Sequence, residues 1–306
     1  MEIQEKKYLS LSEFIQKEMR DFPSFIQPPL YATDQEKQFS DVLVEFNQKQ
    51  PGYLKYIIHT ENMRRIAALH EILGKDSVNA SNNPMLFDVI TRLCKGLGVR
   101  MPVVFTYRAS DIAAIKNVMD AESAANLFVE ENAFTLGTKE SLYVFVSEEL
   151  MTLAQFDENE LLALIAHEVG HAMANHSLRT LTFHSNFVQY FTDVDSKNKI
   201  KRMLSDNLYS RLNEVTADRA ALIACRNVDY VCSMLNKLGN IHPELIDYDD
   251  SKSDHPNNKK RVDMIKLFAD SKLYAECIEL IDGISVNKNL YQYSESDLQV
   301  AIMRMI

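Results

Sequence analysis

The chain has 306 residues, 46% of them hydrophobic, so it can bury a substantial core in one large domain or in one domain with an added lobe. Its 43 acidic and 33 basic side chains give a formal charge of -10, which disfavours nucleic acid and anionic lipid headgroups as partners. These numbers predict a soluble globular protein that does not bind nucleic acid.

The N-terminal stretch MEIQEKKYLSLSEF lacks the basic segment followed by an apolar one that marks a secretory signal. No stretch approaches the roughly 18 uninterrupted apolar residues that a transmembrane helix needs. The four cysteines form no CxxC pair, and we expect reduced thiols at Cys94, Cys225, Cys232 and Cys277. These features predict a cytoplasmic chain with no transmembrane segment.

Helical patterns such as LSEFIQKEM and ENMRRIAALHEIL occupy the first part of the chain and end in the turn-rich SVNASNNP. We therefore expect a helical N-terminal lobe over residues 1–83 and a second domain over residues 84–306. A helix from about Met85 to Lys95 opens the second domain, and Gly96 or Gly98 ends it.

Three segments rich in β-branched and aromatic residues follow that helix. They are MPVVFTY (101–107), NLFVEENAFTLG (126–137) and SLYVFVS (141–147). Turn signals near Gly137 and Lys139 separate the last two. The pattern predicts a small antiparallel sheet.

Helical periodicity resumes at Asp157, which forms a predicted capping box with Glu160. The helix that follows contains HEVGH at residues 167–171. Because one helical turn takes about 3.6 residues, His167 and His171 project from one face and can both reach a zinc ion. Glu168 lies beside them as a candidate general base.

A catalytic zinc site needs a third protein ligand. A metzincin pattern is disfavoured, because Ala174 and Ser177 stand where that class has glycine and histidine. Downstream, NEVTADRAAL supplies Glu214 and Asp218, four residues apart on a helical pattern. Glu214 can complete a His, His, Glu set that leaves a fourth position for water, and Asp218 can accept a hydrogen bond from a ligand histidine.

The chain resembles peptidase family M48 over roughly residues 85–270. The resemblance rests on NAFTLG (132–137), HEVGH (167–171), EVTAD (214–218) and SDHPNNKKR (253–261), in that order. It implies a gluzincin peptidase with a mostly helical, zincin-like α+β domain, whose small sheet lies beside the HExxH helix. It also implies one zinc ion per chain, held by His167, His171 and Glu214.

The resemblance further implies roles for residues that do not bind the metal. Glu168 is the implied base, His255 is assigned to oxyanion stabilisation, and Arg261, six residues later, supports the site. Asn132 and Ala133 belong to the implied edge strand, which would bind an extended peptide or unfolded protein substrate through main-chain hydrogen bonds.

The chain departs from membrane-bound members of the family after the metal-binding helix. The apolar residues of LRTLTFHSNFVQYFTDVDSKNKIKRML are interrupted by polar ones, so an amphipathic helix or a lid is expected within residues 178–210. Besides the zinc endopeptidase, two functions stay open: a latent zinc-containing peptide-binding or chaperone-like module, and a zinc hydrolase of a non-peptide amide. Nitrogen and carboxylate ligands would also accept cobalt or manganese.

The remaining histidines lack partners at ligand spacing. His176, five residues beyond His171, is expected to turn away from the metal around the helix. The others are interpreted as ordinary core or surface residues: His59, His70, His184 and His242.

Overall fold

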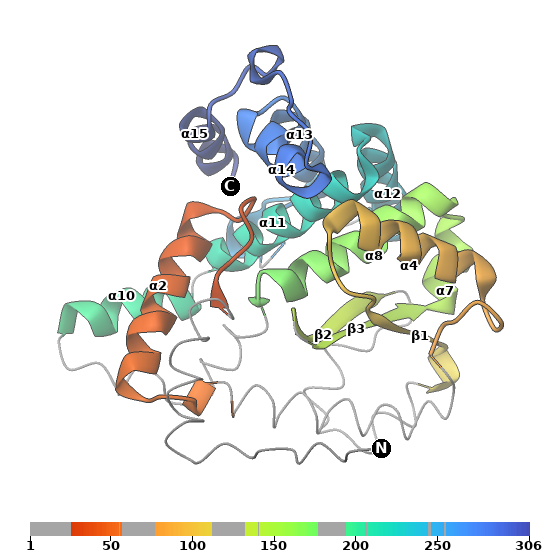
Figure 1. Cartoon of the computed structure of the whole chain (residues 1–306), viewed down its shortest axis with the longest axis horizontal. Coiled ribbons are helices and arrows are strands. Elements are labelled where there is room, and N and C mark those ends of the chain that lie inside the picture. Colours follow the sequence, from red (N-terminus) through yellow and green to blue (C-terminus); the bar gives the residue numbers. More distant parts are fainter. Residues whose placement is uncertain are drawn as a thin grey trace, which may run out of the picture.

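The computed structural model describes residues 26–54, 56, 77–111, 132–139, 141–176, 194–205, 207–243, 246–253 and 255–306. Its helices are α2 (Asp34–Lys49), α4 (Pro84–Leu97), α7 (Glu148–Ala154), α8 (Glu158–Met173), α10 (Val194–Ser205), α11 (Asn207–Cys225), α12 (Val228–Ile241), α13 (Asn258–Ala269), α14 (Lys272–Asp282) and α15 (Glu295–Met305). Its strands are β1 (Val103–Tyr107), β2 (Ala133–Thr138) and β3 (Ser141–Ser147). The predicted α+β class, mostly helical with one small sheet, is confirmed (Figure 1).

The three strands form a mixed sheet in the order β1-β3-β2. β2 and β3 are antiparallel, as predicted, with Thr138 opposite Ser141 next to the turn. β1 runs parallel to β3, with Val103 opposite Tyr143, so the expectation of a wholly antiparallel sheet is wrong for this strand. β1 and β3 can run parallel because β2, which is antiparallel to β3, lies between them in the chain and returns it to the end of the sheet at which β3 begins.

Helix α8 lies between the sheet and α11 and is buried on almost every side (Figure 1). The predicted capping box opens it: Asp157 accepts hydrogen bonds from the backbone of Asn159 and Glu160, and Glu160 accepts one from the backbone of Asp157. These bonds satisfy backbone donors that a helix start leaves unpaired. The cap therefore fixes where the HEVGH helix begins.

Gly170 allows α8 and α11 to approach each other closely. A Cβ atom at this position would lie 2.7 Å from Cβ of Ala220 and 3.0 Å from Cα of Ala217. A glycine within a helix costs about 1 kcal/mol relative to alanine, and here the packing requires it. The contact brings the histidines of α8 to within reach of α11.

Helix α4 covers α8 and α11 on one side. Asn83 caps it by accepting a hydrogen bond from the Leu86 backbone, Pro84 occupies its first turn, and Gly98 ends it at a left-handed φ of 67°. The helix predicted from about Met85 to Lys95 is thus confirmed, with slightly wider bounds.

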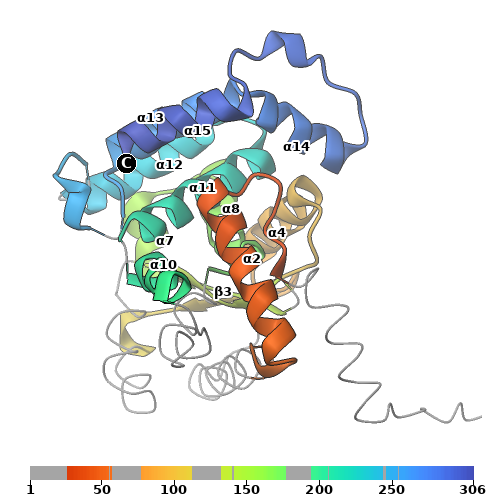
Figure 2. The ribbon, with the colours of Figure 1, turned by 90° about the vertical axis from the view of Figure 1, so that its left-hand side faces the viewer.

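Helix α2 lies against α11 (Figures 1 and 2). Its apolar face shares a small hydrophobic cluster with Ile200 and Met203 of α10. Residues 1–25 and 57–76 of the predicted N-terminal lobe lie outside the described residues, so the division into 1–83 and 84–306 stays a prediction. Of the predicted amphipathic segment, residues 178–193 also lie outside them, and α10 is its described helical part.

Helices α13, α14 and α15 lie on the side of α11 opposite the sheet (Figure 1).

The four cysteines are free thiols, as predicted. Within the described ranges, no helix combines the length and the hydropathy that a membrane crossing needs.

Candidate metal centre

The three predicted metal ligands meet between α8 and α11. His167 and His171 project from α8, and Glu214 projects from α11. The two Nε2 atoms lie 3.1 Å apart, and oxygens of Glu214 lie 3.4 Å from His167 Nε2 and 3.5 Å from His171 Nε2. These spacings match the edge, roughly 3.3 Å, of a tetrahedron around an ion about 2 Å from each donor. The three side chains therefore form a candidate site for one metal ion.

The charge states of these groups suit a cation. Burial, opposed by the charge of Glu214, holds the pKa of His171 well below its ordinary value. Burial alone would lower the pKa of His167, but hydrogen bonds to Asp218 and Glu214 raise it to about 10. Burial alone would raise the pKa of Glu214, but the charges of His255 and His171 lower it well below its ordinary value. In the absence of a metal, His167 therefore holds an extra proton next to Glu214, and a bound cation would displace that proton.

Asp218 holds His167 from behind. Nδ1 of His167 lies 2.9 Å from Oδ1 of Asp218, which leaves Nε2 facing Glu214. Arg261 donates to both oxygens of Asp218, at 2.9 Å from Nε and 2.7 Å from Nη2, and its Nη2 lies 3.4 Å from Glu214. This geometry fixes the tautomer and the orientation of the His167 ring.

A cavity of about 390 Å³ opens onto the three ligands. Every site residue predicted from the sequence lines this cavity except Asp218, which contacts Nδ1 of His167 instead. The lining residues that bear on the chemistry are Asn132, Ala133, His167, Glu168, His171, Glu214, His255 and Arg261.

Glu168 lines the cavity beside the ligands and is 8% exposed. Burial raises the pKa of its carboxyl group to about 7, with a further rise from the charge of Glu214 and an opposing effect of His167. A carboxyl group with a pKa near neutrality can both accept and return a proton at physiological pH.

His255 reaches the same cavity from the loop that precedes α13. Its Nδ1 lies 3.4 Å from a Glu214 oxygen, and its side chain is 53% exposed. Arg211 of α11 holds this loop by donating to the carbonyl oxygens of Asp250 and Ser253 at 3.0 Å and 2.9 Å, and Tyr248 donates to the His255 carbonyl at 2.7 Å. The His255 imidazole therefore lies at the solvent-exposed side of the cavity, on a loop that hydrogen bonds hold in place.

Asn132 and Ala133 line the cavity where β2 begins. Among the described strands, β2 pairs with β3 alone and so forms one edge of the sheet. The Asn132 carbonyl accepts hydrogen bonds from the Ser147 backbone at 2.9 Å and from the Tyr107 hydroxyl at 3.0 Å. These bonds fix the backbone at the point where the sheet edge reaches the cavity.

The sequence model of Peptidase family M48 matches residues 89–268, more than half of the chain. The chain belongs to peptidase family M48. It is also 35% identical over 136 residues to a protein from Arabidopsis thaliana named "Plastoglobule-localized metallopeptidase 48, chloroplastic". That match covers 40% of this chain and 38% of the length of the relative. The resemblance seen in the four sequence segments is therefore confirmed at the level of the family.

The M48 match includes the HEVGH helix, Glu214, Asp218 and the loop with His255 and Arg261. It excludes α2, α14 and α15, because these helices lie outside residues 89–268. A contact from α2 to the centre therefore comes from outside the segment matched to the family.

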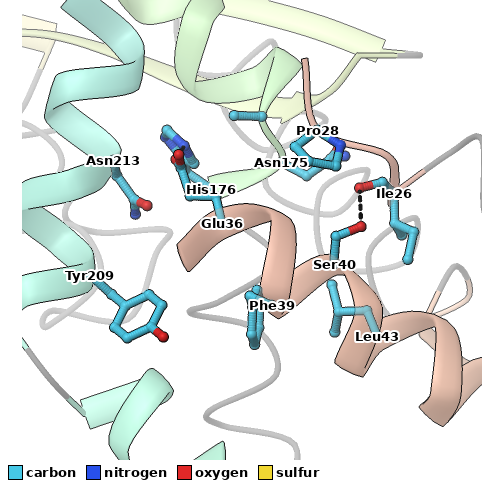
Figure 3. Close-up of a pocket in the computed structure, with 11 residues that line it drawn as sticks. Ile26, Pro28, Glu36, Phe39, Ser40, Leu43, Asn175, His176, Tyr209 and Asn213 are labelled. Atoms are coloured by element: carbon cyan, nitrogen blue, oxygen red, sulfur yellow. Dashed lines mark hydrogen bonds and ion pairs between the residues drawn. The ribbon is translucent and has the colours of Figure 1, made fainter. Parts of the chain in front are cut away.

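Two neighbours of the M48 metal centre were not assigned from the sequence. His176 is not among the three clustered ligand residues, but it does not turn away around the helix as expected, because its Nδ1 lies 2.7 Å from His171 Nδ1. Its Nε2 lies 2.6 Å from Oε1 of Glu36, which comes from α2 (Figure 3). A histidine five residues beyond His171 was the available signal, whereas no spacing along the chain links Glu36 to it.

His242 also lines the cavity, at the end of α12, although it was interpreted as an ordinary core or surface residue. His242 is far along the chain from HEVGH and from Glu214, so no local sequence pattern could have predicted that it lines the cavity.

Proposed function

We propose that this M48 chain is a zinc-dependent endopeptidase that hydrolyses peptide bonds. One observation carries the proposal: three donors at tetrahedral spacing face a cavity that Glu168 also lines. His167, His171 and Glu214 would hold the ion through two imidazole nitrogens and one carboxylate, a donor set that suits zinc. When bound, zinc supplies Lewis acidity that lowers the pKa of water and polarises a carbonyl group.

The residues of the chain perform the proton transfers and the charge stabilisation. Glu168 takes a proton from the attacking water and then returns it to the leaving amine nitrogen. His255 donates an N–H hydrogen bond to the oxyanion that develops on the scissile carbonyl oxygen. Asp218 and Arg261 keep the His167 ring in its ligand orientation through both steps.

The substrate in this proposal is an extended peptide or an unfolded protein. In this proposal β2 pairs near Asn132 and Ala133 with such a chain through backbone hydrogen bonds, without selecting a particular side chain. The cavity beside this edge is large enough for one or a few side chains of the substrate.

The direct test compares wild type and Glu168→Gln on unfolded casein or a peptide library, with and without a chelator. We expect chelator-sensitive cleavage by wild type and at least a hundredfold loss in Glu168→Gln, because removal of the general base leaves metal binding intact. Equal cleavage by the two proteins would overturn the proposed mechanism.

Metal content separates the functions that the sequence left open. Glu168→Gln should retain zinc, whereas Glu214→Ala should lose both zinc and activity. If wild type binds zinc and peptides but shows no chelator-sensitive cleavage, the chain is a peptide-binding module. If it ignores peptides but hydrolyses small amides, the non-peptide hydrolase is the correct function.

A further inference from the structure

A chain of part-buried hydrogen bonds runs from the metal centre to α2. His171 contacts His176 through the two Nδ1 atoms at 2.7 Å, and His176 contacts Glu36 through Nε2 and Oε1 at 2.6 Å. The side chains of His176 and Glu36 are only 8% and 7% exposed. Figure 3 shows Glu36 rising from α2 toward the His176 ring. The contact between His176 and Glu36 is therefore largely shielded from solvent.

The protons of this chain can be assigned in one consistent way. If His171 offers its Nε2 lone pair to a metal, its single proton lies on Nδ1 and is donated to His176 Nδ1. His176 then carries its own proton on Nε2 and donates it to Oε1 of Glu36. Every donor has an acceptor, and no proton is required twice.

Glu36 is held in place as an acceptor. Its second oxygen, Oε2, accepts hydrogen bonds from the Thr33 backbone at 2.6 Å and the Thr33 hydroxyl at 2.7 Å. It also accepts one from the hydroxyl of Thr216, two residues beyond Glu214 on α11. These bonds leave Oε1 directed at His176, so the carboxylate has little freedom to turn away.

The backbone after α8 brings His176 to this position. The helix ends at Met173, and Asn175 adopts a left-handed φ of 56°. On an uninterrupted helix a residue five positions beyond His171 would point well away from it. The left-handed turn instead directs the His176 side chain back toward His171, so the centroids of the two imidazole rings lie 4.9 Å apart.

We propose that Glu36 and His176 are positioning residues that orient His171 as a metal ligand, so that α2 completes the metal centre. This assignment rests on the zinc-peptidase function proposed above. The supporting groups of a ligand histidine set its tautomer and ring orientation, and their loss commonly weakens metal binding by about 10- to 100-fold. Glu36 lies outside the segment matched to the M48 family.

The test is zinc affinity, measured on the full chain by competition with a chromophoric chelator. His176→Ala should weaken zinc binding by about 10- to 100-fold. His176→Gln should be less affected, because its amide offers both an acceptor and a donor. Ser40→Ala is the matched control, since Ser40 lines the same small cavity on α2 but bonds to the Ile26 carbonyl.

One further readout, the Tm of the metal-free protein, distinguishes a structural role from a positioning role. A merely structural His176 would lower the Tm of the metal-free protein and leave the zinc affinity of the folded protein unchanged. Wild-type affinity in a folded His176→Ala variant would overturn the assignment. Failure of the wild-type protein to bind zinc at all would instead contradict the proposed function.

Discussion

His167 and His171 stand one turn apart on the same helix, yet different parts of the molecule hold them. His167 is bonded directly to a carboxylate, Asp218, whose charge is balanced by Arg261. His171 reaches its carboxylate, Glu36, only through the ring of His176. The first support lies within the family-matched residues 89–268, whereas the second recruits α2 from outside them. The two ligand histidines therefore differ in their support, since that of His167 lies within the matched segment and that of His171 includes a residue from outside it.

The largest expected effect comes from removing the charge of the carboxylate that supports His167. Asp218→Asn should destabilise the metal-free protein by about 3 kcal/mol, because it leaves the buried Arg261 with a weaker partner. Zinc affinity should fall about 10- to 100-fold. Urea unfolding and chelator competition measure the two effects.

The matched control for Asp218→Asn is Asp263→Asn, which removes the same charge from an exposed position on α13. It should leave both quantities near their wild-type values. If Asp218→Asn resembles this control, Asp218 does not support the metal centre.

A substitution that moves both histidines together should have the next largest effect. Gly170→Ala adds a Cβ atom 2.7 Å from Cβ of Ala220 and forces α8 away from α11, at a cost of about 1 to 3 kcal/mol. Zinc affinity should fall as Glu214 moves away from both rings. Thermal unfolding and metal competition are the measurements.

Combining Gly170→Ala with Ala220→Gly removes the closest clash and should restore part of both losses. If neither stability nor zinc affinity recovers in the double variant, Gly170 does not act by allowing the close approach of α8 and α11.

Double-mutant cycles sharpen the difference between the two supports. Glu36→Gln and His176→Ala act on one hydrogen-bonded chain, so the second substitution should add little to the loss of zinc affinity caused by the first. Glu36→Gln and Asp218→Asn act on separate supports, and their effects should be nearly additive. Additivity in both cycles would mean that Glu36 does not act through His176.

The smallest expected effect is the pH dependence that Glu36 contributes to the stability of the metal-free protein. Burial alone would raise the pKa of Glu36, but hydrogen bonds from His176, Thr216 and Thr33 lower it below the ordinary value of 4.5. A lowered folded-state pKa adds stability above pH 4.5 that is lost as the pH falls through the folded value.

Glu36→Gln should therefore reduce stability at neutral pH, and the difference from wild type should shrink on acidification. Urea unfolding at a series of pH values measures this trend. A difference that grows as the pH falls would contradict the assigned direction.

The sequence was most informative where local periodicity encodes a helix face. HEVGH, its capping box and the spacing of Glu214 and Asp218 all follow from the geometry of one helical turn, and the metal site and helix start agree with the structure. The same periodicity misled at His176, because it assumes that the helix continues. The helix ends at Met173, and the left-handed backbone of Asn175 then reverses the direction of the next side chain.

Other features depend on how distant segments pack, and local pattern does not encode them. The parallel pairing of β1 with β3 depends on which strands become neighbours in the sheet, whereas strand composition is the same for either direction. Glu36 meets His176 only because α2 packs against α11. Glycine at 170 is unfavourable to a helix by itself, and its reason becomes clear only from Ala217 and Ala220 on the neighbouring helix.

The central claim is that two imidazoles and one carboxylate hold a single zinc ion with one position left open. Zinc-edge X-ray absorption of the purified protein tests it most directly. We predict two imidazole nitrogens and oxygen ligands at about 2.0 Å, with the remaining position occupied by water. A zinc–sulfur distance of about 2.3 Å, or a third imidazole from His176 or His255, would contradict the account.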